Sequence, residues 1–367
     1  MSIILFLIIL GILVVSHEFG HFIVAKLSGM RVDEFGFGFP PKLFGFKYGE
    51  TTYSINLIPF GGFVKIWGED APAGADQLPD YDRSFVGKSK GIQAAVVVAG
   101  VAFNLLLAWG LISLGLMVGM PTPASDTTYG PVENPEVIIT EVLRGTPAEN
   151  AGLLPGDRVI TLERNANETL TPHSAADVQE FIRANETEPV TIRYKRGDAD
   201  EASLILTPEK GIAGEFPAIG VAMETLGIVR LPFFSAIIEG AKLTVDFTKS
   251  TITGLYALVH DLIFGRGALD SVTGPIGLVG LVGTSAALGF TYLLGLTAII
   301  SINLAVMNLI PFPALDGGRL LFIIIEKIKG TPVPPKVANS IHAAGFLILL
   351  LFMAFITWHD IAKLIAA

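Results

Sequence analysis

Two histidines and a glutamate near the start of the chain have the types and spacing of a zinc-binding site. His17, Glu18 and His21 form the pattern H-E-x-x-H. On a helix, residues i and i+4 lie on one face, so both imidazoles reach one Zn²⁺ while the glutamate stands beside the open coordination position. Catalytic zinc takes three protein ligands and one water, whose pKa it lowers to about 7. The pattern therefore predicts a zinc centre in which Glu18 accepts a proton from water.

The surroundings of this motif favour a functional interpretation over a structural one. The alternative is that the three residues are polar side chains satisfied inside a helix bundle. However, residues 3–15 are all apolar and run directly into the motif. Ionisable groups inside such a span are costly, and where they occur they usually mark a functional site.

A third ligand has to come from another part of the chain. Asp316 ends the segment NLIPFPALD, and it is the acid nearest the end of a later apolar stretch. Pro311 and Pro313 break the helix just before it, and membrane proteins tolerate such freed backbone only where it lines a site or cavity. Asp316 is therefore the candidate third ligand, with a solvated aspartate in a helix-ending loop as the alternative.

The composition indicates a membrane protein. Hydrophobic residues make up 51% of the chain and charged residues 16%, whereas soluble domains carry about a quarter charged residues. The net charge of −9 gives no basic surface for nucleic acid, so no nucleic-acid partner is expected. The chain has no cysteine, so any metal must be bound by His, Asp or Glu.

The hydropathy pattern predicts a multi-pass α-helical membrane protein with four transmembrane helices. The first, which contains the motif, is interpreted as a retained helix because no basic residue precedes it and no cleavage site follows. Between the helices we expect a membrane-associated β-hairpin, an inserted α+β domain and an amphipathic interfacial helix. The predicted segments are transmembrane helix 1 (1–26), the hairpin loop (33–66), transmembrane helix 2 (94–119), the inserted domain (134–209), the interfacial helix (232–264), transmembrane helix 3 (288–312) and transmembrane helix 4 (341–365).

Positive charge predicts the orientation of these helices. Basic residues are concentrated in the loops after the first and third spans, and these loops are expected in the cytoplasm. Both termini and the 134–209 domain are then external. The segment 232–264 carries a polar stripe at Glu239, Lys242, Asp246 and Lys249, which favours a helix at the membrane surface. This choice also keeps Asp316 on the same side of the membrane as His17.

The inserted segment resembles a PDZ domain of bacterial envelope proteases. The resemblance rests on Pro147-Ala148 followed by Ala151-Gly152-Leu153 and Gly156-Asp157. Ser174 is a predicted helix N-cap, and an unspecified α+β domain is the alternative.

Taken together, the motifs resemble the site-2 protease family over nearly the whole chain, and most closely its bacterial regulator-of-sigma-E type with one PDZ domain. The resemblance rests on HEFGH, on NLIPFPALDGG, on GFGFP with IPFGGFVK, and on Gly100 with Asn104. It implies an intramembrane zinc metalloendopeptidase of the bacterial cytoplasmic membrane, with the active site toward the cytoplasmic side. His17, His21 and Asp316 are then the Zn²⁺ ligands, Glu18 the catalytic base, and Asn303 and Asn308 substrate-binding residues.

The resemblance also implies the partners. Substrates are expected to be single-pass membrane proteins within the lipid bilayer, such as a pre-trimmed anti-sigma factor or signal-peptide remnants, with an upstream site-1 protease as a further partner. A transmembrane helix must unwind before cleavage. Residues 51–58 alternate between polar and apolar side chains, which predicts an edge strand that pairs with the unwound segment. Two alternatives remain open at this point: a membrane-anchored PDZ scaffold and a metal transporter.

Overall fold

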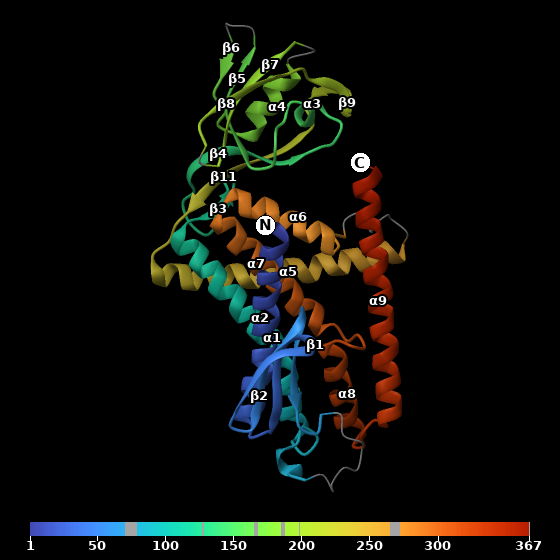
Figure 1. The fold of residues 1–367 in the computed structure, drawn as a ribbon. Helices are drawn as coiled ribbons and strands as arrows, with labels where there is room; N and C mark the ends of the chain where they lie inside the picture. Colours follow the sequence, from blue (N-terminus) through green and yellow to red (C-terminus); the bar gives the residue numbers. More distant parts are fainter. Residues whose placement is uncertain are drawn as a thin grey trace. The chain divides into compact units, whose positions relative to one another are not determined.

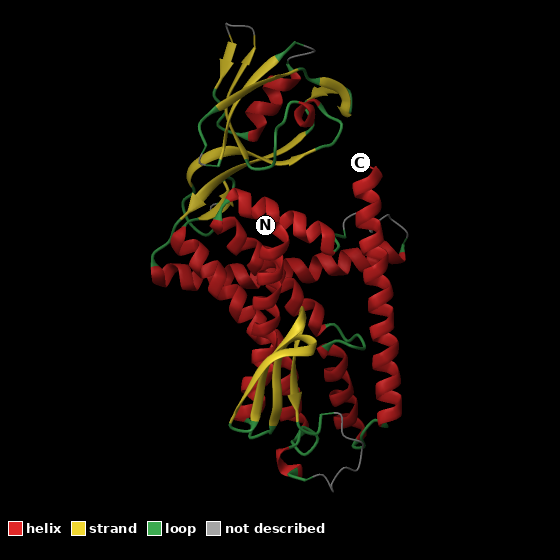
Figure 2. Ribbon diagram, viewed as in Figure 1, coloured by secondary structure: helices red, strands yellow, loops and turns green. Residues whose placement is uncertain are grey.

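The computed structural model describes residues 1–69, 79–126, 128–164, 168–184, 188–197, 199–264 and 272–366. The chain divides into two compact units, which are described separately. The first comprises residues 1–112, 240–279 and 297–361, and the second comprises residues 113–239, 280–296 and 362–367. Figure 1 follows the chain from the N-terminus, and Figure 2 distinguishes its helices from its strands.

Four helices in the described ranges are long and apolar enough to cross a membrane. They are α1 (Ser2–Leu27), α2 (Lys90–Val118), α7 (Phe290–Leu309) and, within α9 (Pro335–Ala366), the stretch Lys336–Ala362. The expectation of a membrane protein with four such helices is therefore confirmed. The third is shorter than predicted, because Pro311 lacks the N–H that would continue the helix.

Small residues let α1 and α2 approach closely in the first unit. A Cβ atom on Gly20 would lie only 2.4 Å from the backbone oxygen of Ala99. Glycine at such a contact allows two apolar helices to pack backbone against backbone. Near this contact, a buried cluster joins α1, α2 and α8 (Asp316–Lys329), with Ala25, Val96 and Ile323 among its members.

The two strands β1 (Val32–Tyr48) and β2 (Thr51–Ile66) form a sheet in which they pair with each other along two separate stretches. Phe35 pairs with Val64 on one side and with Tyr53 on the other, and Tyr53 also pairs with Phe46. The residues around Tyr53 are therefore paired on both sides. The prediction that 51–58 is an edge strand is wrong there, because β1 folds back along both sides of this part of β2. The segment 62–66, in contrast, is paired with β1 on one side only.

The second unit contains a sheet with the order β3-β11-β4-β5-β7-β8, with β6 paired to β5. Its strands are β3 (Met120–Pro123), β4 (Glu133–Val142), β5 (Asp157–Arg164), β6 (Glu168–Leu170), β7 (Val190–Arg196), β8 (Ala202–Leu206) and β11 (Val221–Val229). Two short strands, β9 (Glu209–Ala213) and β10 (Phe216–Ala218), pair with each other. The sheet thus extends beyond residue 209, since β11 lies between β3 and β4.

Two helices complete this domain, α3 (Pro147–Asn150) and α4 (Ala175–Arg183). Ser174 is the N-cap of α4, as predicted, and forms a capping box with Asp177. Val178 and Ile182 of α4 join Val159 and Ile192 of the sheet in one buried core.

The remaining helices are η1 (Tyr81–Arg83), α5 (Phe233–Ile263) and α6 (Pro275–Leu288). α6 is apolar but shorter than a membrane span, and α5 is not among the four candidate spans. Each of these two helices contributes residues to both compact units.

Candidate metal centre

α1 presents the two histidines of the H-E-x-x-H motif on one face. The rings of His17 and His21 meet edge to face with centroids 4.8 Å apart, and their Nε2 atoms are separated by 3.2 Å. Both side chains are largely buried, with 10% and 13% of their surface exposed. One turn of helix therefore brings two nitrogen donors to a common point.

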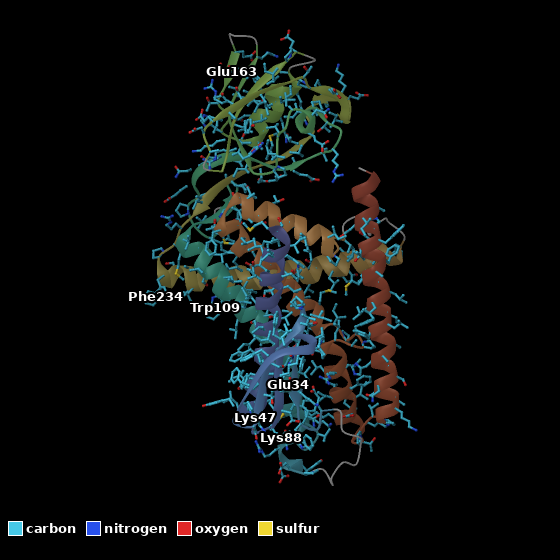
Figure 3. The ribbon with its side chains drawn as sticks, in the orientation of Figure 1. Glu34, Lys47, Lys88, Trp109, Glu163 and Phe234 are labelled. Carbon is cyan, nitrogen blue, oxygen red and sulfur yellow. The ribbon has the colours of Figure 1, made fainter. Side chains whose placement is uncertain are left out.

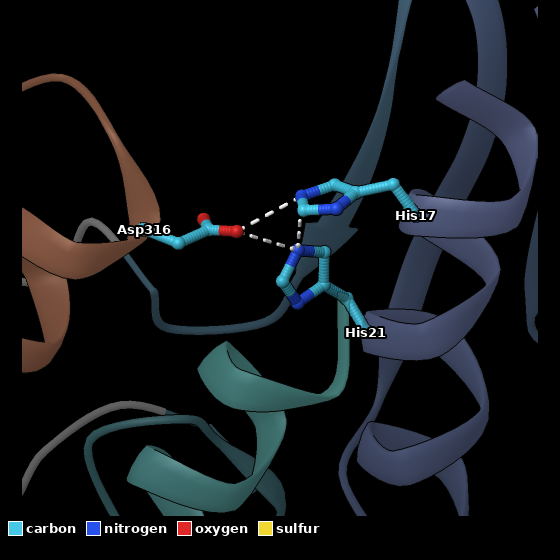
Figure 4. A group of neighbouring side chains, drawn as sticks. All are labelled: His17, His21 and Asp316. Atoms are coloured by element: carbon cyan, nitrogen blue, oxygen red, sulfur yellow. Dashed lines mark hydrogen bonds and ion pairs between the residues drawn. The ribbon is translucent and has the colours of Figure 1, made fainter. Parts of the chain in front are cut away.

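Asp316 approaches the same point from the first turn of α8. Its Oδ2 atom lies 2.9 Å from His17 Nε2 and 3.3 Å from His21 Nε2 (Figure 4). The three ligand atoms all lie within 4.8 Å of one another. Residues almost 300 positions apart in the sequence thus form one cluster.

The turn before α8 explains how the sequence holds Asp316 in place. Ala314 has a left-handed φ of 77°, and Leu315 caps the helix in an extended conformation. The N–H of Ala314 donates to His342 Nδ1 of α9 at 3.1 Å. A Cβ on Gly317 would lie 2.1 Å from the oxygen of Ile310, and one on Gly318 would lie 2.3 Å from the oxygen of Phe312. The two glycines after the aspartate are therefore required because the turn folds tightly over the start of the helix.

The cluster fits a tetrahedral zinc ion. With Zn–N and Zn–O bonds of about 2.0–2.1 Å, tetrahedral ligand atoms lie about 3.3 Å apart, close to the separations above. Two imidazoles and one carboxylate also match the three protein ligands of catalytic zinc sites. The buried Oδ2 of Asp316 faces the Nε2 atoms of both imidazoles. It is thus an acceptor atom that a cation would satisfy.

The backbone orients one imidazole for ligation. His21 Nδ1 lies 2.8 Å from the carbonyl oxygen of Val96 in α2, to which it donates. A proton on Nδ1 leaves the lone pair of Nε2 free to face the cluster. A Cβ on Gly100 would come within 2.5 Å of His21 Nε2, so this position of α2 has room only for glycine.

Glu18 lines the same pocket, which has a volume of about 190 Å³. Val64, Glu69 and Arg319 also line it, and Arg319 forms an ion pair with Glu69. A Cβ on Gly62 would lie 3.1 Å from Glu18 Cγ, so β2 passes directly over the glutamate. The glutamate, the candidate metal cluster and a sheet edge therefore share one pocket.

The two asparagines are placed elsewhere. Asn303 is exposed on α7, and its Oδ1 accepts a hydrogen bond from Thr251 of α5 at 2.9 Å. Asn308 is partly buried one residue before the end of α7. Neither is among the described residues that line the 190 Å³ pocket.

Two groups that contact the imidazoles had no role assigned from the sequence. The carbonyl of Val96 leaves no signal in the sequence, since every residue has one. Asn104, which the sequence singled out only as part of a motif, is fully buried in α2 with its Nδ2 3.4 Å from His17 Nδ1. A buried amide in an apolar helix was the available signal.

Comparison with known proteins agrees with this geometry. A family model described as peptidase family M50 matches residues 5–352. The chain is 32% identical to a zinc metalloprotease RasP of Geobacillus kaustophilus, over 99% of this chain and 98% of the relative. It is 28% identical to the zinc metalloprotease RasP of Oceanobacillus iheyensis and 29% identical to the regulator of sigma-W protease RasP of Bacillus subtilis, each over 99% of both chains. The pocket joins H-E-x-x-H to a distant aspartate, and the family model covers nearly the whole chain. The chain therefore belongs to peptidase family M50.

Proposed function

We propose that this protein is an intramembrane zinc metalloendopeptidase that cleaves transmembrane segments of other membrane proteins. The observation that carries the proposal is the convergence of His17, His21, Asp316 and Glu18 on one pocket. Three of these four residues lie on α1, a helix long enough to span a membrane. Membership in a peptidase family and the names of the relatives support zinc and proteolysis over the scaffold and transporter alternatives.

In this proposal His17, His21 and Asp316 hold the metal and Glu18 is the general base. Bound zinc would supply a Lewis acid that polarises the scissile carbonyl and lowers the pKa of water. Glu18 accepts the proton of the attacking water and delivers it to the leaving amine. Asn303 and Asn308 do not line this pocket, so we assign them to holding the substrate backbone and not to stabilising the oxyanion.

The sheet edge at residues 62–66 supports a role in presenting the substrate. A helical substrate has its amides bonded internally, so the scissile bond becomes accessible only after local unwinding. An unwound segment regains backbone hydrogen bonds by pairing with an exposed strand edge. Gly62, Phe63 and Val64 line the pocket, so a substrate strand added at this edge passes Glu18.

An apolar groove on α1 supports a membrane-embedded substrate. The groove has a volume of about 660 Å³ and runs along Ile4, Ile8, Ile12 and Phe19 toward Phe37 of β1. Its walls suit the side chains of a single transmembrane helix. We place single-pass proteins of a bacterial cytoplasmic membrane in this role, such as a pre-trimmed anti-sigma factor or signal-peptide remnants, with a site-1 protease acting first. The regulatory name of the Bacillus subtilis relative supports this.

The α+β domain is assigned as a PDZ-like domain on the external side, and the metal pocket lies toward the cytoplasm. Basic residues support this orientation: Lys47 and Lys88 (Figure 3) lie at the end of the first unit away from the N-terminus, which is marked in Figure 1. We assign the domain as a filter that excludes substrates with bulky external portions. Its removal is then expected to permit cleavage of untrimmed substrates, whereas slower cleavage of trimmed ones would indicate a carboxylate receptor.

The function is tested by comparing the protein with its Glu18→Gln variant. Both are expressed in cells, and the membrane peptides that accumulate are identified by mass spectrometry. Loss of the base is expected to reduce turnover at least about 100-fold, so uncut substrates accumulate only with the variant. The same set of peptides in both cells would contradict the proposal.

The strand-edge assignment is tested in the same Glu18→Gln background. A photocrosslinking amino acid at Phe63 is expected to capture the accumulated substrates. The matched position is Tyr53, which is paired on both sides within the sheet and is expected to capture none. Equal capture at both positions would show that the sheet edge does not bind substrate.

A further inference from the structure

The two imidazoles of the metal cluster are held in different ways. His21 donates to the backbone carbonyl of Val96, which accepts hydrogen bonds and cannot donate them. His17 instead has the carboxamide of Asn104 beside it, with Nδ2 3.4 Å from Nδ1. Asn104 is 0% exposed, and across the described residues its Oδ1 atom is buried without a hydrogen-bond partner.

Ligation changes what His17 requires from this neighbour. With Asn104 Nδ2 facing it, Nδ1 of His17 is the acceptor, so the ring proton is on Nε2, the atom that faces Asp316. A metal on Nε2 requires the lone pair of that atom, and the proton then moves to Nδ1. Nδ1–H needs an acceptor, and a half-turn of the carboxamide places Oδ1 where Nδ2 now lies. A neutral amide serves both states, because it carries a donor and an acceptor on one carbon.

We propose that Asn104 is a positioning residue for the zinc centre: it accepts a hydrogen bond from Nδ1 of metal-bound His17 through Oδ1 and turns its amide when the metal is lost. This inference rests on the proposed zinc centre. It gives a buried asparagine in an apolar helix a role that apolar packing does not require. It also predicts that metal affinity depends on the acceptor at position 104 and not on its volume.

The test measures the zinc affinity of purified protein in detergent by competition with a chelator. Asn104→Leu keeps the approximate volume and removes the acceptor, and it is expected to weaken zinc binding about 10- to 100-fold. Asn104→Asp keeps an acceptor and is expected to retain at least the wild-type affinity. If the leucine variant does not fold, Asn104→Ala makes the same comparison with a smaller side chain.

A matched control separates positioning from packing. Ser301 Oγ of α7 donates to the backbone oxygen of Asn104 at 2.8 Å, so Ser301→Ala disturbs the same residue without touching the imidazole. This variant is expected to bind zinc within twofold of wild type, with a similar thermal midpoint. The visible spectrum of the Co²⁺-substituted protein adds a second readout, which is expected to change in Asn104→Leu alone.

The outcomes distinguish this inference from the function on which it rests. Wild-type protein that binds no zinc would contradict the proposed function itself. Zinc-binding wild type together with an unchanged Asn104→Leu would overturn the positioning role. The same holds if Asn104→Asp binds as weakly as Asn104→Leu, or if Ser301→Ala loses affinity equally.

Discussion

At the scale of single residues, the metal cluster is defined by atoms that lack other partners. His17, His21 and Asp316 direct one donor atom each to a common point, and the buried Oδ2 of Asp316 faces both imidazole Nε2 atoms. Glu18 lies in the same pocket but outside the cluster of three donor atoms. This placement supports the proposal that Asp316 binds the metal whereas Glu18 accepts the proton.

This separation predicts different effects for two substitutions. Asp316→Ala is expected to lower both zinc content and peptide hydrolysis, because a ligand is removed. Glu18→Gln is expected to abolish hydrolysis and keep zinc, because the amide leaves all three ligands in place. Zinc per chain is measured by atomic emission after dialysis against a weak chelator. Full metal content in Asp316→Ala would place the third ligand elsewhere.

At the scale of elements, the distance between α1 and α2 fixes the centre. A Cβ on Gly100 of α2 would lie 2.5 Å from His21 Nε2 and 2.7 Å from His17 Cε1, closer than any real contact. Helix α2 also carries the acceptor for His21. The second helix is thus part of the metal site although it supplies no ligand.

Gly100→Ala is therefore expected to displace the imidazoles and to lower zinc affinity and activity together. Gly110→Ala in the same helix is the matched control, because nothing lies within 4 Å of its Cβ position. In an open helical position, alanine is favoured over glycine by about 1 kcal/mol, so this control is expected to be neutral or slightly stabilising. Zinc affinity and thermal midpoint are measured for both. Equal behaviour of the two variants would contradict the close-packing explanation.

The turn between β1 and β2 is tied to its neighbours by an acidic residue. Glu50 accepts hydrogen bonds from Lys26 Nζ at 2.7 Å and from Arg83 Nη2 at 2.7 and 2.8 Å. The bond from Lys26, followed by that from Arg83, lowers the pKa of Glu50 below its usual value. Because the pKa is lowered on folding, Glu50 contributes stability above the unfolded-state pKa, and this contribution is lost as pH falls through the folded-state pKa.

Glu50→Gln is therefore expected to lower the thermal midpoint at pH 7 and to equal wild type at strongly acidic pH. The midpoint is measured in detergent across this range. Asp82→Asn, at an exposed acid of η1 next to Arg83, is the control and is expected to have the thermal midpoint of wild type at each pH. A constant gap between Glu50→Gln and wild type at every pH would show that the carboxylate charge is not the cause.

At the scale of the whole molecule, the metal cluster constrains the topology. His17 lies in the C-terminal half of α1, and Asp316 follows α7, so we expect both helices to approach the same membrane face. An even number of crossings must then separate the ends of α1 and α7. With α2 and α7 as the candidate spans between them, we expect no net crossing from α5 and α6.

The absence of cysteine makes this topology directly testable. Single cysteines at Ser125 and Gly211 are expected to react with an impermeant maleimide from outside intact cells. Cysteines at Lys47 and Lys329 are expected to react only after the membrane is opened, because basic loops are retained in the cytoplasm. External labelling at Lys329 would put Asp316 on the wrong side of the membrane.

The sequence by itself determined the chemistry and the long helices. H-E-x-x-H specifies two donors on one helical face through the 3.6-residue period alone, and continuous apolar runs specify spans through length alone. The N-cap at Ser174 was equally local, because a capping box is closed within four residues. These features depend on neighbours in the chain, so a sequence contains them in full.

The tertiary structure decided everything that depends on pairing between distant segments. Residues 51–58 alternate as an edge strand does, yet only the return of β1 along both sides shows that residues 52–55 lie inside the sheet. The partners of His21 and His17, the Val96 carbonyl and the Asn104 amide, lie 75 and 87 residues away. Side-chain periodicity reports which face a residue occupies but not what lies against that face, because that choice is made by packing between elements.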